Sequence, residues 1–259
     1  MRYECHNEDG LYGVGEHIPA EQIDLVITKP PSQAQTDFDD EDAYFTWSEA
    51  WLMHAHRVLR YGGSCYLVGS KDLLDTLYHA ALSAGFVYKQ KFVLNESDGI
   101  LLFYRNPMLF VRGLLKSQQA IRQLSGRAIN EMLGSSGTGG GKWSYYTGNS
   151  ARLPSREVWD KLQEIFSFSY PYDVMEIVYN PIYKTVDLRN LAAQDPIALP
   201  EALVKMGSRE GDAVLDPFAR TGDAGVAALR NGCTFYGFET DEALYSTMLQ
   251  RLEAEDTAE

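Results

Sequence analysis

In the first third of the chain, short continuous apolar runs alternate with longer stretches in which apolar residues recur at helical spacing. Ile23–Thr28 is a short apolar run, whereas the apolar residues of Tyr44–Leu59 recur at roughly helical spacing until "YGG" interrupts them. The strand-like run "SCYLVG" (64–69) follows, and Leu73–Ala84 again has helical spacing. The pattern predicts a strand, a helix, a strand and a helix in this order.

The same alternation returns near the C-terminus. We expect a strand at "AVLD" (213–216), a helix over Gly222–Arg230, a strand at "CTFYGFE" (233–239) and a closing helix over Glu242–Glu253. Strands that alternate with helices at both ends of a chain are typical of a largely parallel sheet with helices on both faces. The fold class is therefore predicted to be α/β and doubly wound.

The middle of the chain interrupts this alternation. "FVYKQKFVL" (86–94) and "MLFVRGLL" (108–115) predict two further strands, close enough to form an antiparallel pair. A glycine-rich stretch, "GSSGTGGGK" (134–142), predicts a flexible loop, and an amphipathic helix is expected from Arg156 to about Phe166.

The composition of the 259 residues excludes several classes of protein. The chain is 45% hydrophobic, yet no apolar run approaches the roughly 18 residues that span a bilayer, and the polar N-terminus does not resemble a signal peptide. The three cysteines form no C-x-x-C pair, which favours a reduced, cytoplasmic protein. The five histidines show no metal-ligand spacing, so we expect no metal site. Because no apolar run is long enough to span a bilayer, we also expect no membrane partner.

The charge is distributed unevenly along the chain. The net charge is −13, but the segment from Arg105 to Arg156 holds eight basic residues and one acidic residue, which makes it +7 and the remainder −20. We call residues 105–156 the basic segment. Such a split predicts a polyanion partner, and aromatic residues interleaved with the charges favour this over a merely solvated basic face. The candidate contacts are Arg112, Lys116, Arg122, Arg127, Lys142, Trp143, Tyr145 and Arg152. The competing interpretation is that the aromatics pack on the following helix.

Two turns at strand ends carry the candidate chemistry. "ITKPPSQ" (27–33) places two prolines after an apolar run, a rigid turn that fixes Lys29 and Ser32. "VLDPFARTGDAG" (214–225) has an acid at the strand end, a proline turn and a glycine-containing entry to a helix. Ligands of doubly wound sheets bind beside such turns, and Glu239 after the next strand is placed to bind a ribose diol.

These stretches resemble the DNA amino-methyltransferases, which methylate adenine N6 or cytosine N4 with S-adenosylmethionine. The likeness is to the permuted (beta) group. "IDLVITKPPSQ" resembles the strand and catalytic tetrapeptide, usually Asp/Asn/Ser-Pro-Pro-aromatic; "VLDPFARTGDAG" resembles the cofactor turn, and "YGFETDEALYSTMLQRLE" the ribose-binding strand and helix. "GKWSYYTGNSARLPSREVWDKL" looks like part of the region that reads the target.

The resemblance implies a seven-stranded methyltransferase-type sheet in permuted order with a small basic insert. It implies a catalytic half at 1–112, a target-recognition-like insert at 113–170 and a cofactor-binding half at 171–259, with the turns 28–32 and 216–222 side by side. The implied site residues are Lys29, Pro30, Pro31 and Ser32 for catalysis and Asp216, Pro217, Phe218, Arg220, Gly222 and Glu239 for S-adenosylmethionine.

The tetrapeptide departs from the family at both chemical positions. The family's first residue accepts a hydrogen bond from the exocyclic amine, and its last residue stacks on the flipped base. Charged Lys29 offers donors and no acceptor, and Ser32 has no ring. Asp37 or Asp39 could supply an acceptor instead, and Phe38 or Tyr44 a ring; we favour loss of catalysis over such a rescue.

The cofactor turn departs at Arg220, where the family has a glycine because the backbone approaches the cofactor closely. The arginine either points to solvent, blocks the pocket or pairs with an anionic ligand. We expect a weakened S-adenosylmethionine site.

The favoured function is therefore a DNA-binding homologue of these enzymes whose catalysis is impaired or lost, acting beside an active methyltransferase subunit or as a homodimer. One alternative is an active enzyme with rerouted residues, in which Asp37 or Asp39 is the acceptor or a neutral Lys29 the base. The other is a methyltransferase-fold protein that binds a small anionic ligand through Arg220 and Lys29 and has no nucleic-acid role. The basic segment counts against this last alternative.

Overall fold

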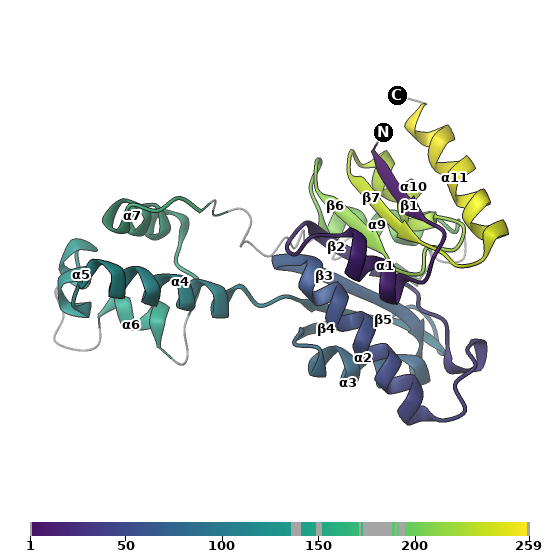
Figure 1. The fold of residues 1–259 in the computed structure, drawn as a ribbon, viewed down its shortest axis with the longest axis horizontal. Helices are drawn as coiled ribbons and strands as arrows, with labels where there is room; N and C mark the ends of the chain where they lie inside the picture. The colour runs from purple at the N-terminus through teal and green to yellow at the C-terminus, as the bar shows by residue number, and fades with distance from the viewer. Residues whose placement is uncertain are drawn as a thin grey trace. The chain divides into compact units, whose positions relative to one another are not determined.

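The computed structural model of the protein describes residues 2–135, 141–148, 152–170, 172, 188–189, 191 and 195–257 (Figure 1). The chain forms two compact units. The first, which we call the sheet unit, comprises Met1–Arg105 and Ile177–Glu259, and the second, the helical unit, is Asn106–Glu176. Within the described ranges, no helix is long and apolar enough to cross a membrane.

Among its described residues, the sheet unit has seven strands in the order β1-β7-β6-β2-β3-β5-β4. Pairing is parallel from β1 through β3 and antiparallel for β3 with β5 and β5 with β4. The predicted fold class is confirmed. The strands are β1 (Tyr3–His6), β2 (Ile23–Thr28), β3 (Leu59–Ser70), β4 (Val87–Val93), β5 (Asp98–Tyr104), β6 (Ala213–Asp216) and β7 (Thr234–Phe238).

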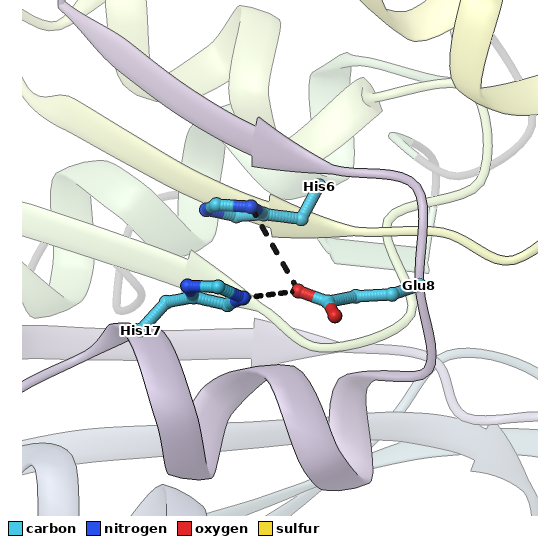
Figure 2. A group of neighbouring side chains, drawn as sticks. All are labelled: His6, Glu8 and His17. Carbon is cyan, nitrogen blue, oxygen red and sulfur yellow. Dashed lines mark ion pairs between the residues drawn. The ribbon is translucent and has the colours of Figure 1, made fainter.

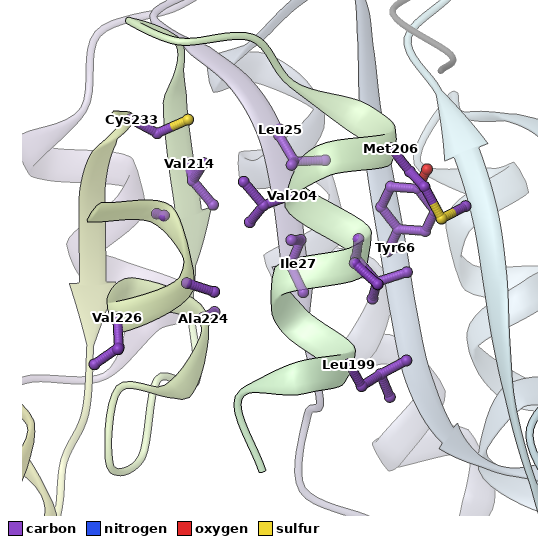
Figure 3. Packing of buried hydrophobic residues seen from close by; sticks show 14 of the residues in the cluster. Leu25, Ile27, Tyr66, Leu199, Val204, Met206, Val214, Ala224, Val226 and Cys233 are labelled. Carbon is purple, nitrogen blue, oxygen red and sulfur yellow. The ribbon is translucent and has the colours of Figure 1, made fainter. Parts of the chain in front are cut away.

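Helices cover both faces of this sheet because each face presents a continuous apolar layer. On one face, Leu25 and Ile27 of β2 and Tyr66 of β3 pack with Val204 and Met206 of α9 (Figure 3). A second cluster fills the other face, beneath α1, α2 and α3. The helices of the unit are α1 (Gly10–His17), α2 (Glu41–Val58), α3 (Lys71–Ser83), α9 (Ala198–Gly207), α10 (Asp223–Arg230) and α11 (Glu242–Asp256), with a short 3-10 turn, η1 (Gln33–Gln35).

One predicted strand is wrong. "MLFVRGLL" lies in a helix, α4 (Pro107–Arg122), and the antiparallel partner of β4 is β5 instead. The side chain of Asn106 accepts a hydrogen bond from the amide of Met108, and Pro107 occupies the first turn, where its missing N–H costs nothing. Because Val111 and Leu115 are one turn apart and both buried, the run has a helical core face.

The helical unit has a core of its own. Its helices are α4, α5 (Gly126–Met132), α6 (Lys142–Thr147) and α7 (Arg156–Phe166), the last of which confirms the predicted amphipathic helix. In the described part of this unit, eight buried residues form the core: Val111, Leu115, Ile129, Leu133, Trp143, Trp159, Leu162 and Phe166. The insert expected at 113–170 thus lies within a unit that begins earlier, because α4 carries core residues on the N-terminal side of residue 113.

Candidate cofactor and catalytic site

The carboxyl ends of β2 and β6 meet at the centre of the sheet. The two strands pair in parallel, with Val26 opposite Leu215. The hydroxyl of Thr28 donates a hydrogen bond of 2.6 Å to Asp216 Oδ1, and this oxygen also accepts the amide of Phe218 at 3.0 Å. The two turns therefore lie side by side at the switch point, as the sequence predicted.

Asp216 is buried, and burial raises the pKa of its carboxyl group to about 7, while the hydrogen bonds from Thr28 and Phe218 oppose the rise. A carboxylate with these two donors is anchored by its neighbours. Its main action in this site is to hold the start of the cofactor turn against the end of β2.

The cofactor turn has two residues in the left-handed region. Gly222 has φ +79°, and Arg220, unusually for a residue with a side chain, has φ +50°. The amide of Arg220 donates to Glu239 Oε2 at 2.8 Å, and the amide of Asp241 donates to Glu239 Oε1 at 2.9 Å. The backbone thus keeps a conformation that suits glycine, at a cost of about 1 kcal/mol for the arginine.

A cavity of about 590 Å³ opens beside the two turns. Its lining combines three cationic side chains with apolar residues of α9 and of the sheet. The lining residues that bear on ligand binding are Thr28, Lys29, Asn95, Asp98, Arg189, Pro196, Leu199, Asp216, Phe218, Arg220 and Asp223. A second cavity of about 510 Å³ is lined by Glu8, Asp9, Pro31, Asp37, Phe38, Trp47, Pro217, Phe218 and Glu239 among others. Phe218 contributes to both.

The residues of the tetrapeptide have separate environments. Lys29 is exposed and lines the first cavity, and Pro30 is buried. The carbonyl of Pro31 accepts the hydroxyl of Tyr44 at 2.7 Å. Ser32 caps η1, where its amide and its hydroxyl both donate to the side-chain oxygen of Gln35. Ser32 is therefore a local structural residue.

The proposed substitutes for the missing ring are not equivalent. Tyr44 is only 2% exposed and is tied to Pro31, so it cannot swing into a cavity, and this part of the expectation is wrong. Phe38 packs on the rings of Tyr44 and Trp47 but also lines the second cavity, together with Asp37. Phe38 and Asp37 thus place a ring and a carboxylate in the same cavity as Pro31, although neither residue belongs to the tetrapeptide.

Comparison with known proteins identifies the family. A family model described as "DNA methylase", for adenine-N6 and cytosine-N4 methyltransferases, matches residues 23–250. The chain belongs to this DNA methylase family. The DNA adenine methyltransferase YhdJ of Escherichia coli K12 is 25% identical over 249 residues, which is 91% of this chain and 78% of that protein. The type II methyltransferase M.HpaI of Haemophilus parainfluenzae is 22% identical over 260 residues, 93% of this chain and 71% of that one.

Solved structures of DNA methylases share the fold. TTHA0409 of Thermus thermophilus, a candidate DNA modification methylase solved with S-adenosyl-L-methionine, has a TM-score of 0.58 and 19% identity, and the match covers 99% of this chain and 96% of that one. The cytosine-N4-specific PvuII DNA methyltransferase has a TM-score of 0.57 at 14% identity, with coverage of 97% and 86%.

S-adenosylmethionine, the cofactor of the DNA methylase family, fits the residues present at this turn. The carboxylate of Glu239 uses one lone pair of each oxygen for the two backbone amides, so further lone pairs remain for ribose hydroxyls. The backbone of the turn retains its glycine-like path at Arg220 and Gly222. What differs is the guanidinium side chain, which is exposed and lines the first cavity.

Replacing Arg220 by glycine is expected to strengthen S-adenosylmethionine binding by roughly tenfold. The variant removes a side chain from the cavity without altering Glu239 or Asp216. Titration calorimetry with S-adenosylmethionine measures the effect, and Arg220→Ala, which also removes the guanidinium, should strengthen binding similarly, because the backbone strain at residue 220 affects stability in the free and bound protein alike. Equal or weaker binding in Arg220→Gly would make the arginine harmless or a ligand contact.

The candidate DNA contacts of the helical unit fall into two groups. Trp143 is 6% exposed, packs on Phe166 and donates from its indole N–H to Gln119, so its assignment as a DNA contact is withdrawn and the core interpretation holds. Arg122 donates to the carbonyl of Phe166 at the end of α7, and Arg127 pairs with Glu131. Arg112 is half-buried. Lys116, Lys142, Tyr145 and Arg152 are exposed.

The structure also assembles a group that the sequence pattern did not single out. His6 ends β1, Glu8 lies in the loop that follows, and His17 ends α1, and a ligand atom of each lies within 4.8 Å of the others. Their spacing along the chain matches no familiar metal motif. They are brought together by the turn between β1 and α1, two elements too short to be predicted.

Proposed function

We propose that the protein is a DNA-binding member of the DNA methylase family that binds S-adenosylmethionine and transfers methyl groups poorly or not at all by itself. The observation that carries the proposal is Lys29, exposed at the end of β2 in the first cavity, where the family has a hydrogen-bond acceptor. The relatives named above are DNA methyltransferases, which supports DNA as the partner.

The chemistry explains why this one side chain matters. S-adenosylmethionine supplies a methyl group on a sulfonium cation, and the attacking amine becomes more positive as it accepts the methyl. An acceptor beside the amine stabilises that charge, whereas an ammonium group repels it. Lys29 therefore opposes the reaction at the position where the family assists it. Ser32 adds nothing to base stacking, since it has no ring and its hydroxyl donates a hydrogen bond to the side chain of Gln35.

The chain's own residues retain the means to hold a cofactor. Glu239 is anchored by two amides and lines the second cavity, and Asp216 holds the turn against β2. A protein that binds cofactor and DNA without rapid transfer is suited to act beside an active methyltransferase subunit or as one half of a homodimer. We extend the proposal to such a paired arrangement.

The DNA-binding surface is assigned to α4, α5 and α6 of the helical unit. These helices and their connections carry Lys116, Lys142 and Arg152, all exposed. Helix α7 is excluded because its exposed side chains include three acids, Glu157, Asp160 and Glu164. Phosphate binding is therefore expected on the side of the unit away from the acids of α7.

Binding of a fluorescent duplex, measured by anisotropy over a range of salt concentrations, tests this assignment. The affinity should fall steeply with salt, with a log–log slope of about −0.9 for each phosphate neutralised. The triple variant Lys116→Ala/Lys142→Ala/Arg152→Ala should weaken binding and flatten the slope by about 2 to 3. Lys205→Ala, which removes an exposed cation of α9 in the sheet unit, is the matched control and should change neither quantity.

One observation favours the rerouted enzyme as a second candidate. Asp37 and Phe38 line the cavity that also contains Pro31, so an acceptor and a ring occur together next to the tetrapeptide. In that mechanism Asp37 would accept the hydrogen bond of the target amine. Methyl transfer that depends on Asp37 would support this candidate over the first. The small-anion alternative would gain support if the parent protein showed no DNA binding at low salt.

A further inference from the structure

We propose that His6, Glu8 and His17 form a binding site for a divalent transition-metal ion of the zinc class. The three side chains converge from β1, the loop after it and the end of α1 (Figure 2). This site lies outside the catalytic tetrapeptide and the cofactor turn. Its test requires neither DNA nor S-adenosylmethionine, so it stands or falls independently of the proposed function.

The carboxylate of Glu8 is the centre of the group. Its Oε1 atom is buried and, among the described residues, has no hydrogen bond of normal geometry. His17 Nε2 lies 2.6 Å from it and His6 Nδ1 3.8 Å from it. A buried carboxylate oxygen needs a polar or charged partner, and a metal ion is a better partner for it than either imidazole ring alone. The oxygen and the two ring nitrogens together form a ligand set for such an ion.

The orientation of His6 is fixed from its other side. Its Nε2 atom lies 3.0 Å from Glu4 Oε1, and because a carboxylate only accepts, the neutral tautomer that donates to Glu4 is the one with its proton on Nε2. Nδ1 then presents its lone pair toward Glu8. Metal-ligating histidines typically donate their second N–H to a carboxylate in this way. Glu4 is accordingly a positioning residue for the proposed ligand.

Aromatic packing holds both rings in place. The imidazoles of His6 and His17 are stacked, with centroids 4.1 Å apart and an angle of 8° between their planes. His6 also stacks on Phe238, at 5.3 Å. Rings with restricted orientations lose little conformational freedom when they bind an ion, which favours affinity. Binding of one ion by both nitrogens requires the two stacked rings to tilt toward each other, because their lone pairs lie in nearly parallel planes.

The ligand types define the class of ion. Two imidazoles and one carboxylate suit zinc and its transition-metal neighbours, whereas magnesium and calcium prefer sets made of oxygen atoms. The three side chains are 26 to 36% exposed, so water can complete the coordination. A bound ion would tie the loop after β1 to the end of α1, and Glu8 and Asp9 of that loop line the second cavity.

Competition with a chromophoric chelator measures zinc binding to the tag-free, chelator-treated full chain. We expect one Zn²⁺ per chain with a dissociation constant in the micromolar range or tighter, and no displacement by millimolar Mg²⁺. His17→Ala and Glu8→Gln should weaken binding by at least about a hundredfold, and Glu4→Gln by about 10- to 100-fold. His79→Ala, an exposed histidine of α3, is the matched control and should bind like the parent.

Two results would overturn the proposal. One is the absence of saturable zinc binding to the parent protein, and the other is unchanged affinity in both His17→Ala and Glu8→Gln. If these variants fail to fold, the absorption spectrum of the Co²⁺-loaded parent decides instead. The proposed ligands contain no sulfur, so a thiolate charge-transfer band would place the ion on a cysteine and contradict the assignment.

Discussion

The purified protein is expected to transfer almost no methyl group to mixed-sequence duplex DNA, and the double substitution Lys29→Asp/Ser32→Tyr is expected to raise transfer by about a hundredfold or more. The first change exchanges a cation in the cavity for an acceptor, and the second supplies a ring next to Pro31. A single preorganised electrostatic partner is commonly worth about 100-fold or more in rate. The rate of transfer of a tritiated methyl group from S-adenosylmethionine to the DNA is measured for the parent protein and for the double variant.

The comparison needs a control for stability, since Ser32 caps η1. Losing the hydrogen bond from its hydroxyl to Gln35 costs about 1 kcal/mol, and Ser32→Ala measures that cost without adding a ring. Lys29→Ala separates removal of the cation from addition of an acceptor. Robust transfer by the parent, abolished by Asp37→Ala or Asp39→Ala, would refute the impaired-enzyme proposal and establish the rerouted mechanism. If the double variant binds cofactor and DNA yet remains as inactive as the parent, Lys29 is not the cause.

Trp143→Ala is expected to lower the free energy of unfolding of the helical unit by about 3 to 5 kcal/mol. The indole is nearly enclosed, packs on Phe166 and donates to the part-buried side chain of Gln119, so its removal leaves a cavity and breaks that hydrogen bond. Hydrogen exchange followed by mass spectrometry localises the effect. Amides of α4 to α7 should exchange faster, whereas those of β2 and β6 should keep their protection.

Tyr145→Ala is the matched control, because this ring is 59% exposed on the same helix. It should change stability by no more than about 0.5 kcal/mol, and any loss of DNA affinity in it reports a contact. At a temperature where the Trp143→Ala protein stays folded, its DNA affinity should match that of the parent. Weaker DNA binding with unchanged protection of the helical unit would instead make Trp143 a stacking residue.

The chain's local patterns were enough to predict the architecture. Strand–helix alternation at both ends predicted a largely parallel sheet, and the two proline turns at 30–31 and 217 follow strands that pair side by side, as predicted. These features are readable because parallel strands are apolar throughout and helices between them have one apolar face. The substitutions at Lys29 and Arg220 are likewise visible in the sequence, because the surrounding motif fixes what each position must do.

What the sequence could not provide is the environment of each side chain. "MLFVRGLL" is as apolar as a strand and becomes a helix because Asn106 and Pro107 begin one there and its buried residues face a core formed from distant helices. In the sequence, Trp143 lies among cationic residues and is a candidate to insert into DNA, but in the structure its ring packs on Phe166.

The sequence alone therefore determined the fold class and the family, since these depend on local pattern and motif spacing. Only the tertiary structure decided that Arg220 keeps a glycine-like backbone, that Tyr44 is locked to Pro31, and that His6, Glu8 and His17 meet. Each of these findings depends on contacts between residues whose spacing in the sequence follows neither the period of a helix nor that of a strand, so the hydrophobic pattern does not predict the contacts. The physical reason is that burial and pairing are properties of packed surfaces, which form only when the elements come together.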